Sequence, residues 1–145
     1  MLKQLSIYAE NKKGALQTMT NALYEAGINI WGSVTNDGAE YGINRMVVSD
    51  PDKAKEVLTE KGYLCRFVDV LAVEIEDKPG ALNTLLTALL DSNVNVDYTY
   101  LSFNRDSSTP VMILHTADPE EVEICLRAKG FKMVSVSYTH LTLPT

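Results

Sequence analysis

The sequence predicts an α+β protein that contains two copies of one small structural unit. Two observations carry this prediction: a long internal repeat, and the same succession of strand-like and helix-like segments in each copy. The length agrees with it, because 145 residues suffice for two very small domains. We expect the first unit at residues 1–68 and the second at residues 69–137.

The repeat consists of two matched blocks. Residues 10–30 read ENKKGALQTMTNALYEAGINI, and residues 76–96, which lie 66 positions later, read EDKPGALNTLLTALLDSNVNV. Residues 50–63 (DPDKAKEVLTEKGY) match residues 118–131 (DPEEVEICLRAKGF) at an offset of 68. Two collinear matches in the same order indicate the duplication of one unit.

Each copy opens with a strand and a helix. The strand shows the alternating apolar residues of a half-buried strand, namely Leu5, Ile7 and Ala9 in the first copy and Leu71, Val73 and Ile75 in the second. The helix shows one apolar stripe, formed by Leu16, Met19, Ala22, Leu23 and Ala26 in the first copy and by Leu82, Leu85, Leu86, Leu89 and Leu90 in the second. Gly27 and Asn93 tolerate the left-handed conformation and are expected to end the two helices.

Each copy continues with two strands, a second helix and a last strand. Segments rich in β-branched residues and the strands that return from them are expected at 28–35 with 42–49, and at 94–101 with 110–116. Asp50-Pro51 and Asp118-Pro119 begin the second helix, with aspartate as the N-cap and proline in the first turn. Glycine ends this helix in both copies, at Gly62 and Gly130.

The resulting order, βαββαβ, is the ferredoxin-like plan, an antiparallel sheet with strand order 4-1-3-2 and two helices on one face. The second strand then lies on an open edge, which is a liability for so small a unit. We therefore expect the two second strands to pair within the chain, giving an eight-stranded antiparallel sheet with four helices on one face. Residues 66–70 contain no Gly, Pro or Ser, which predicts a tight tether. Pairing of these edges between chains is the alternative arrangement.

Composition and charge argue against several classes of protein. The net charge is −6 and the sequence has no basic stripe, which disfavours nucleic acid as a partner. Its apolar runs are far shorter than the ~20 residues of a membrane-spanning helix, and we expect no signal peptide. Cys65 and Cys125 are interpreted as reduced core residues of a cytoplasmic protein. Residues 138–145 have no counterpart in the first copy, and we interpret them as a non-native extension.

The sequence offers no catalytic or metal-binding constellation. Its histidines, His115 and His140, have no nearby partners at metal-ligand spacing, so neither a metal nor a cofactor is expected. No serine or cysteine has a base at motif spacing. An acylphosphatase-like enzyme on this fold would need an arginine in the first loop, where the sequence has only lysines. We therefore do not expect an enzyme.

The repeated motifs resemble those of the ACT domain, a βαββαβ module that usually senses amino acids. A strand ends in Glu-Asn or Glu-Asp, Lys-x-Gly-Ala-Leu opens a helix, and Asn-Ile or Asn-Val opens the next strand. The resemblance covers residues 3–137 and is nearest to stand-alone tandem ACT proteins that bind amino acids. The second copy, residues 77–82 (DKPGAL), fits the D-x-P-G-x-L pattern fully. The first copy has Asn11 for the aspartate and Lys13 for the proline.

Two ligand sites are predicted at the loops that open these helices. Backbone amides at a helix N-terminus suit an α-carboxylate, and Asn11 or Asp77 is placed to accept from the ammonium group. Antiparallel pairing of the second strands would bring the asparagine of each unit to the loop of the other. The resemblance likewise implies a seam between the units as the place of the ligand. The first site comprises Asn11, Gly14, Ala15 and Leu16 with Asn95 and Val96; the second comprises Asp77, Gly80, Ala81 and Leu82 with Asn29 and Ile30. The charge of Asp77 and the complete motif favour the second site.

Two non-catalytic functions remain open on the sequence. A glycine at a strand-to-helix turn is needed for geometry alone, and Asn or Asp there is an ordinary helix cap. The first hypothesis is a regulatory amino-acid sensor, which is the role that the resemblance implies. The alternative is a ligand-free assembly module that docks on a partner enzyme or a transcription regulator. A homodimer is expected in either case, and the sequence does not indicate which amino acid binds.

Overall fold

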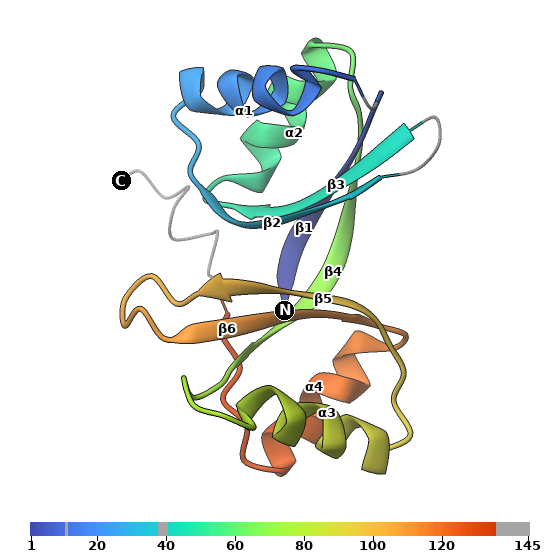
Figure 1. The fold of residues 1–145 in the computed structure, drawn as a ribbon, viewed down its shortest axis with the longest axis vertical. Helices are drawn as coiled ribbons and strands as arrows, with labels where there is room; N and C mark the ends of the chain where they lie inside the picture. Colours follow the sequence, from blue (N-terminus) through green and yellow to red (C-terminus); the bar gives the residue numbers. More distant parts are fainter. Residues whose placement is uncertain (11, 38–40, 136–145) are drawn as a thin grey trace. The chain divides into compact units, whose positions relative to one another are not determined.

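The computed structural model describes residues 1–10, 12–37 and 41–135. In these residues six strands and four helices follow one another along the chain (Figure 1). The strands are β1 (Leu2–Glu10), β2 (Ile30–Asp37), β3 (Tyr41–Val48), β4 (Leu64–Glu74), β5 (Val96–Phe103) and β6 (Pro110–Thr116). The helices are α1 (Ala15–Glu25), α2 (Pro51–Glu60), α3 (Ala81–Asp91) and α4 (Pro119–Ala128).

Contacts between residues divide the chain into two compact units. Among the described residues, the first unit lies within Lys3–Val68, and the second consists of residues 69–135 together with Met1–Leu2. The N-terminal amino group lies 3.0 Å from the carboxylate of Glu123 on α4, which holds Met1 in the second unit. β4 contributes residues to both units, because the division falls in the middle of this strand.

The first unit has the strand order β2-β3-β1-β4, which is the predicted ferredoxin-like order. Leu5 of β1 pairs with Met46 of β3, and both side chains belong to the apolar core. Leu23 of α1 and Leu58 of α2 complete that core from the helices and are fully buried. The apolar alternation of the strands and the stripe on each helix thus meet in one core, as the sequence predicts.

In the second unit β6 lies between β4 and β5. Leu71 of β4 pairs with Leu114 of β6, and both side chains are buried in a second core cluster with Leu85 of α3 and Leu126 of α4. On the other side of β4, the backbone N–H of Glu74 donates to the carbonyl of Lys132 at 2.9 Å.

The predicted eight-stranded sheet is wrong, because the described residues form six strands in the order β2-β3-β1-β4-β6-β5. Two predicted strands are one strand, since β4 continues through residues 66–70, where a tether was expected. Phe67, Val68 and Val70 favour extended backbone there, and no Gly or Pro interrupts it. In the described part of the chain, the predicted last strand is reduced to a single bridge between Val73 and Met133.

The pairing of the two second strands is absent from the ladders of the described residues. β2 pairs with β3, β5 pairs with β6, and each stands at one end of the strand order. The edge-to-edge arrangement from which the eight strands were predicted is therefore corrected, and the two units share β4 instead.

Helix ends fall at the predicted residues, with one difference in chemistry. The carboxylate of Asp50 caps α2 by accepting from the backbone N–H of Lys53 at 3.2 Å. Asp118 holds the same position before α4, but its side chain makes no capping hydrogen bond, and its backbone is left-handed with φ of 51°. The predicted capping role of Asp118 is therefore wrong. Gly27 and Asn93 follow α1 and α3 with φ of 74° and 59°, as predicted.

One polar side chain is buried in the core of the first unit. Asn44 of β3 is only 3% exposed and shares the helix-covered face of the sheet with Met46. Its Nδ2 donates to Thr35 Oγ1 at 2.8 Å, but its Oδ1 has no hydrogen-bond partner within the described part of the chain. The repeat places Met112, a core residue, at the corresponding position of the second unit.

We predict that Asn44→Leu stabilises the protein by about 1–2 kcal/mol. The substitution removes the Oδ1 acceptor, which is buried away from solvent and has no hydrogen-bond partner among the described residues. Urea unfolding followed by circular dichroism measures the change. Thr35→Val is the matched control and is expected to act in the opposite direction, since it leaves the Asn44 amide unpaired. A loss of stability in Asn44→Leu would contradict the prediction.

Candidate functional site

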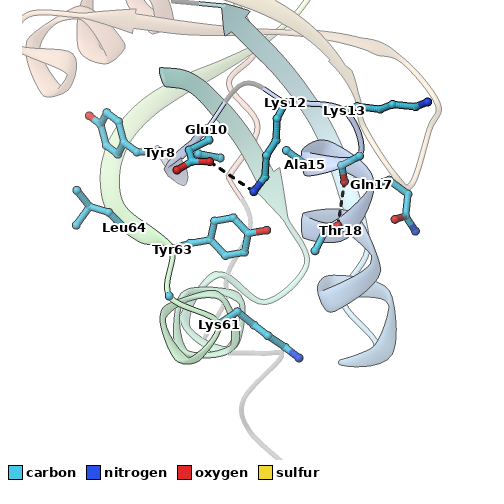
Figure 2. Close-up of a pocket in the computed structure, with 13 residues that line it drawn as sticks. Tyr8, Glu10, Lys12, Lys13, Ala15, Gln17, Thr18, Lys61, Tyr63 and Leu64 are labelled. Carbon is cyan, nitrogen blue, oxygen red and sulfur yellow. Dashed lines mark hydrogen bonds and ion pairs between the residues drawn. The ribbon is translucent and has the colours of Figure 1, made fainter. Parts of the chain in front are cut away.

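The two units carry pockets at corresponding positions of the repeat. The first-unit pocket has a volume of about 910 Å³ and the second-unit pocket about 410 Å³. The first-unit pocket is lined by Tyr8, Ala9, Glu10, Lys12, Lys13, Gly14, Ala15, Gln17, Thr18, Lys61, Gly62, Tyr63 and Leu64 (Figure 2). The second-unit pocket is lined by Glu74, Ile75, Glu76, Lys78, Ala81, Thr84, Thr109, Gly130, Phe131 and Lys132.

Two connections of the fold build each pocket. In the first unit they are the loop from β1 into α1 and the turn from α2 into β4, which lie at the same end of the ferredoxin-like unit. In the second unit they are the loop from β4 into α3 and the turn that follows α4. The duplication has therefore preserved the place of the pocket as well as the fold.

The loop before α1 is a tight turn that leaves amides free. Gly14 has φ of 83°, a conformation that side chains disfavour. The Gly14 carbonyl accepts from the backbone N–H and from the hydroxyl of Thr18, each at 2.9 Å. The backbone N–H of Ala15 donates to the backbone carbonyl of Lys12 at 3.1 Å. The N–H groups of Leu16 and Gln17 have no partner among the described residues, and glycine offers no capping side chain. These amides and the helix dipole favour an anionic group at this point.

The same turn recurs before α3. Gly80 has φ of 86°, its carbonyl accepts from the backbone N–H and hydroxyl of Thr84 at 2.9 and 3.0 Å, and the N–H of Ala81 donates to Lys78 at 3.2 Å. The backbone geometry of the two loops is therefore equivalent, and any difference between the pockets comes from side chains.

An ion pair spans the mouth of each loop. Lys12 lies 3.5 Å from Glu10, and Lys78 lies 2.8 Å from Glu76, with all four side chains largely exposed. Figure 2 shows Lys12 reaching toward Glu10 above Tyr63, whereas Lys13 and Lys61 point away from the pocket. A surface ion pair of this kind is worth at most about 1 kcal/mol, so an incoming charged ligand can rearrange it.

Side chains from the neighbouring strand make the two pockets different. Tyr8 and Leu64 of the first-unit pocket correspond to Glu74 and Lys132 of the second. The carboxylate of Glu74, only 12% exposed, accepts from Asn104 Nδ2 at 2.6 Å and lies 3.4 Å from Lys132 Nζ. At these two positions the second-unit pocket has charged side chains and the first-unit pocket has an aromatic and an aliphatic one, while a Glu-Lys ion pair lines both pockets. The larger space thus lies in the first unit, although the sequence favours the second loop.

The structure distributes the predicted site residues over several places. Gly14 and Ala15 line the first-unit pocket, and Ala81 lines the second-unit pocket. Leu16 and Leu82 are exposed by 50% and 37%, and Asp77 and Gly80 are also exposed. The remaining predicted residues lie elsewhere: Asn29 and Ile30 line a separate pocket of about 390 Å³, Asn95 one of about 470 Å³, and Val96 packs on the second core. Asn11 lies outside the described residues.

Within its own unit, each predicted asparagine already has local partners. The backbone N–H of Asn29 donates to Ser49 Oγ at 2.9 Å. Asn95 Nδ2 donates to Asp97 at 3.3 Å, and Asp97 in turn lies 2.8 Å from His115 Nδ1. The strand pairing that would have brought these asparagines to the opposite loops is absent from the described ladders. The candidate site at each loop is therefore described from the residues of its own unit.

Sequence reasoning missed the turn from α2 into β4. Tyr63 lies in this turn, and its hydroxyl points toward the space between Lys12 and Thr18 in Figure 2. The signal was present, because the repeat at offset 68 aligns Gly62-Tyr63 with Gly130-Phe131 and the βαββαβ plan puts both connections at one end of the unit. The tyrosine hydroxyl is thus a feature of the first unit that the second lacks.

The described residues show little other chemistry. Among them, no three His, Cys, Asp or Glu side chains come together in a way that would hold a metal ion. None of the helices that the structure describes has the length and apolar character that a membrane crossing requires. Burial raises the pKa of the Cys65 thiol, and the charge of Lys55 and the Thr59 side chain offset this only in part.

Comparison with known proteins places this geometry among related folds. Residues 1–137 match the family model described as an ACT domain pair. The chain is similar to protein BT0572 from Bacteroides thetaiotaomicron, with 30% identity over 92% of this chain and 91% of that one and a TM-score of 0.84. It is also similar to the aspartate kinase regulatory subunit from Thermus thermophilus, with 17% identity over 87% and 88% of the chains and a TM-score of 0.64. The corresponding regulatory subunit from Thermus flavus is 20% identical over 88% of this chain and 91% of that one, with a TM-score of 0.59. The kinase subunits show a shared fold alone, and no protein of curated function matches the sequence.

We predict that Gly14→Ala and Gly80→Ala destabilise the protein by similar amounts, roughly 1–2 kcal/mol each, because both need a left-handed backbone. No atom lies within 4 Å of a Cβ placed at either residue, so the loss reflects backbone strain and not a clash. Thermal unfolding measures it. Gly42→Ala is the control, because φ at Gly42 is not positive, and this variant is expected to lose less stability. Equal losses at all three glycines would contradict the explanation.

A second prediction concerns thiol reactivity. The raised pKa keeps Cys65 a neutral thiol at pH values where an ordinary cysteine is partly ionised, and only the thiolate reacts with alkylating reagents. We therefore expect Cys125, which is less buried, to react first in the native protein at pH 8. Mass spectrometry after timed iodoacetamide treatment distinguishes the two. Equal labelling is expected only after unfolding, and equal labelling of the native protein would show the prediction to be wrong.

Proposed function

The chain belongs to the ACT domain pair family, and on this premise we propose that it is a non-catalytic regulatory module that binds an amino acid in the first-unit pocket. The observation that carries the proposal is the difference between two pockets with equivalent backbone geometry. The first-unit pocket is more than twice as large, and it has Tyr8 and Leu64 at the positions where the other has Glu74 and Lys132. Its volume falls in the range of ordinary ligand pockets.

The groups around the first-unit pocket match the two charges of an amino acid. The N–H groups of Leu16 and Gln17, for which the described residues provide no partner, suit the α-carboxylate. The Glu10 carboxylate, held only by an exposed ion pair, suits the α-ammonium group. Tyr8 and Tyr63 then supply apolar surface for the ligand side chain and one hydroxyl for a polar contact.

Names of related structures support a regulatory role. Two of the similar proteins are regulatory subunits of aspartate kinase, an amino-acid-converting enzyme by its name. We propose that this chain likewise responds to an amino acid and transmits the response to a partner enzyme or regulator. Ligand binding regulates only when it favours one arrangement of the protein over another, typically by a few kcal/mol.

The second candidate function is a ligand-free assembly module that docks on an enzyme or a transcription regulator. The second-unit pocket favours it, because this pocket is less than half as large and its Glu74 carboxylate is already engaged by Asn104 and Lys132. The glycine turn is also explained by geometry alone. Under this alternative the first-unit pocket has no natural ligand, and the protein acts through its surfaces.

Thermal-shift measurements with each of the twenty amino acids test the proposed ligand. A ligand at 100 times its dissociation constant adds ~2.7 kcal/mol to stability, which raises the unfolding midpoint by several degrees in a chain of this size. We expect a selective response that Ala15→Glu abolishes, because a carboxylate at the first helical position repels the ligand carboxylate and reduces the pocket. The substitution itself suits a helix N-terminus, so the protein is expected to stay folded.

Ala81→Glu is the matched control, because it places the same charge at the corresponding position of the second unit. It is expected to leave the response intact. Asn29→Ala and Asn95→Ala test the asparagines predicted from the sequence. A flat response to all twenty amino acids would support the assembly module, and a response lost equally in Ala15→Glu and Ala81→Glu would overturn the assignment to the first unit.

A further inference from the structure

The charged side chains of the first-unit pocket are mostly cationic. Among the described residues that line it, Lys12, Lys13 and Lys61 stand against one carboxylate, that of Glu10. The lining of the second-unit pocket is balanced, with two glutamates and two lysines. The whole chain carries a net charge of −6, so a cationic lining is a local property of the first-unit pocket. Lys12 is the lysine that reaches over this pocket in Figure 2.

The hydroxyl of Tyr63 is a second donor beside Lys12. Tyr63 is half-buried, and its hydroxyl points toward the space between Lys12 and Thr18 (Figure 2). The Thr18 hydroxyl already donates to the Gly14 carbonyl at 2.9 Å. Within the described part of the chain no group forms a hydrogen bond with the Tyr63 hydroxyl. The second unit has Phe131 at this position, so the additional donor belongs to the first unit alone.

The ion pair at the mouth of the pocket determines which ligand charge suits these donors. Glu10 and Lys12 balance one another across 3.5 Å. When the ammonium group of an amino acid takes the place of Lys12 beside Glu10, Lys12 loses its carboxylate partner. The α-carboxylate does not replace that partner, because the helix amides hold it. A second carboxylate on the ligand does replace it, and the Tyr63 hydroxyl donates to the same group.

We propose that the ligand of the first-unit pocket is a dicarboxylic amino acid of the aspartate or glutamate class, whose side-chain carboxylate binds between Lys12 Nζ and the Tyr63 hydroxyl. The inference rests on the proposed function and adds the chemical class of the ligand to it. A neutral amino acid leaves Lys12 with water as its partner, and a basic one places a like charge beside it. Lys12 and Tyr63 are therefore the residues that determine specificity.

Isothermal titration calorimetry of the full chain with L-glutamate, L-aspartate and their amides, L-glutamine and L-asparagine, tests the ligand class. Each acid has nearly the same size as its amide and differs from it mainly in charge. We expect one of the acids to bind about tenfold more tightly than its own amide, because hydrogen bonds to a charged group are stronger than those to a neutral one. A dicarboxylate without the amino group, 2-oxoglutarate, is expected to bind more weakly than L-glutamate because it offers Glu10 no ammonium group.

Two variants assign the preference to the named side chains. Lys12→Met is expected to weaken binding of the acid roughly tenfold and to leave binding of the amide unchanged or slightly stronger, since Glu10 is then free. Tyr63→Phe, which introduces the second unit's own residue, is expected to weaken the acid more than the amide. Lys78→Met is the matched control, because Lys78 corresponds to Lys12, and it is expected to preserve the preference. Circular dichroism establishes that each variant is folded.

The outcomes separate this inference from the proposed function. A chain that binds a neutral or basic amino acid, and binds neither acid more tightly than its amide, retains the proposed function and overturns the ligand class. A flat response to all amino acids overturns both. A preference for the acid that Lys12→Met leaves intact, or that Lys78→Met removes equally, overturns the assignment to Lys12. Binding of 2-oxoglutarate as tight as that of L-glutamate overturns the role of the ammonium group.

Discussion

The fold depends on one uninterrupted strand. β4, Leu64–Glu74, supplies the last strand of the first unit and the first strand of the second, with Val70, Leu71, Ala72 and Val73 fully buried. In the first unit Cys65 of this strand packs in the core, and in the second unit Leu71 pairs with Leu114 of β6. Each pocket is lined by residues at or beside one end of β4, Tyr63 and Leu64 in the first unit and Glu74 and Ile75 in the second. The two copies of the repeat are therefore joined by a strand to which both contribute, with no separate linker.

Local features of the sequence were read correctly, and long-range pairing was not. The apolar alternation around Leu5 and Leu71, the stripe on each helix and the glycine at each turn depend on neighbouring residues, so they predict elements and their order. The number of strands depends on which edges meet. The residues of Arg66–Val70 favour extended backbone, but a short extended tether and a continuing strand share that local pattern. Asp118 shows the same limit, because its position before Pro119 predicts a cap while its backbone conformation prevents one.

The same distinction between local and long-range features applies to the candidate site. Gly14 and Gly80 could be identified because a strand, a tight turn and a helix follow in sequence. Tyr63 was missed because it lies nearly fifty residues away, and only the repeat combined with the βαββαβ plan indicates that its turn lies at the same end of the unit. The contacts that Glu74 makes with Asn104 and Lys132 were also invisible, since these side chains meet from three separate segments. Identical motifs thus predict identical loops without predicting equal sites.

The Glu74 contacts have an energetic consequence for the second unit. A guest that used the Glu74 carboxylate would have to take the place of Asn104, whose amide donates to it. An acceptor that is only 12% exposed and loses its donor opposes that exchange by about 1–3 kcal/mol. The space beside it stays open, so what the second unit has lost is one free carboxylate, which its own side chains already satisfy.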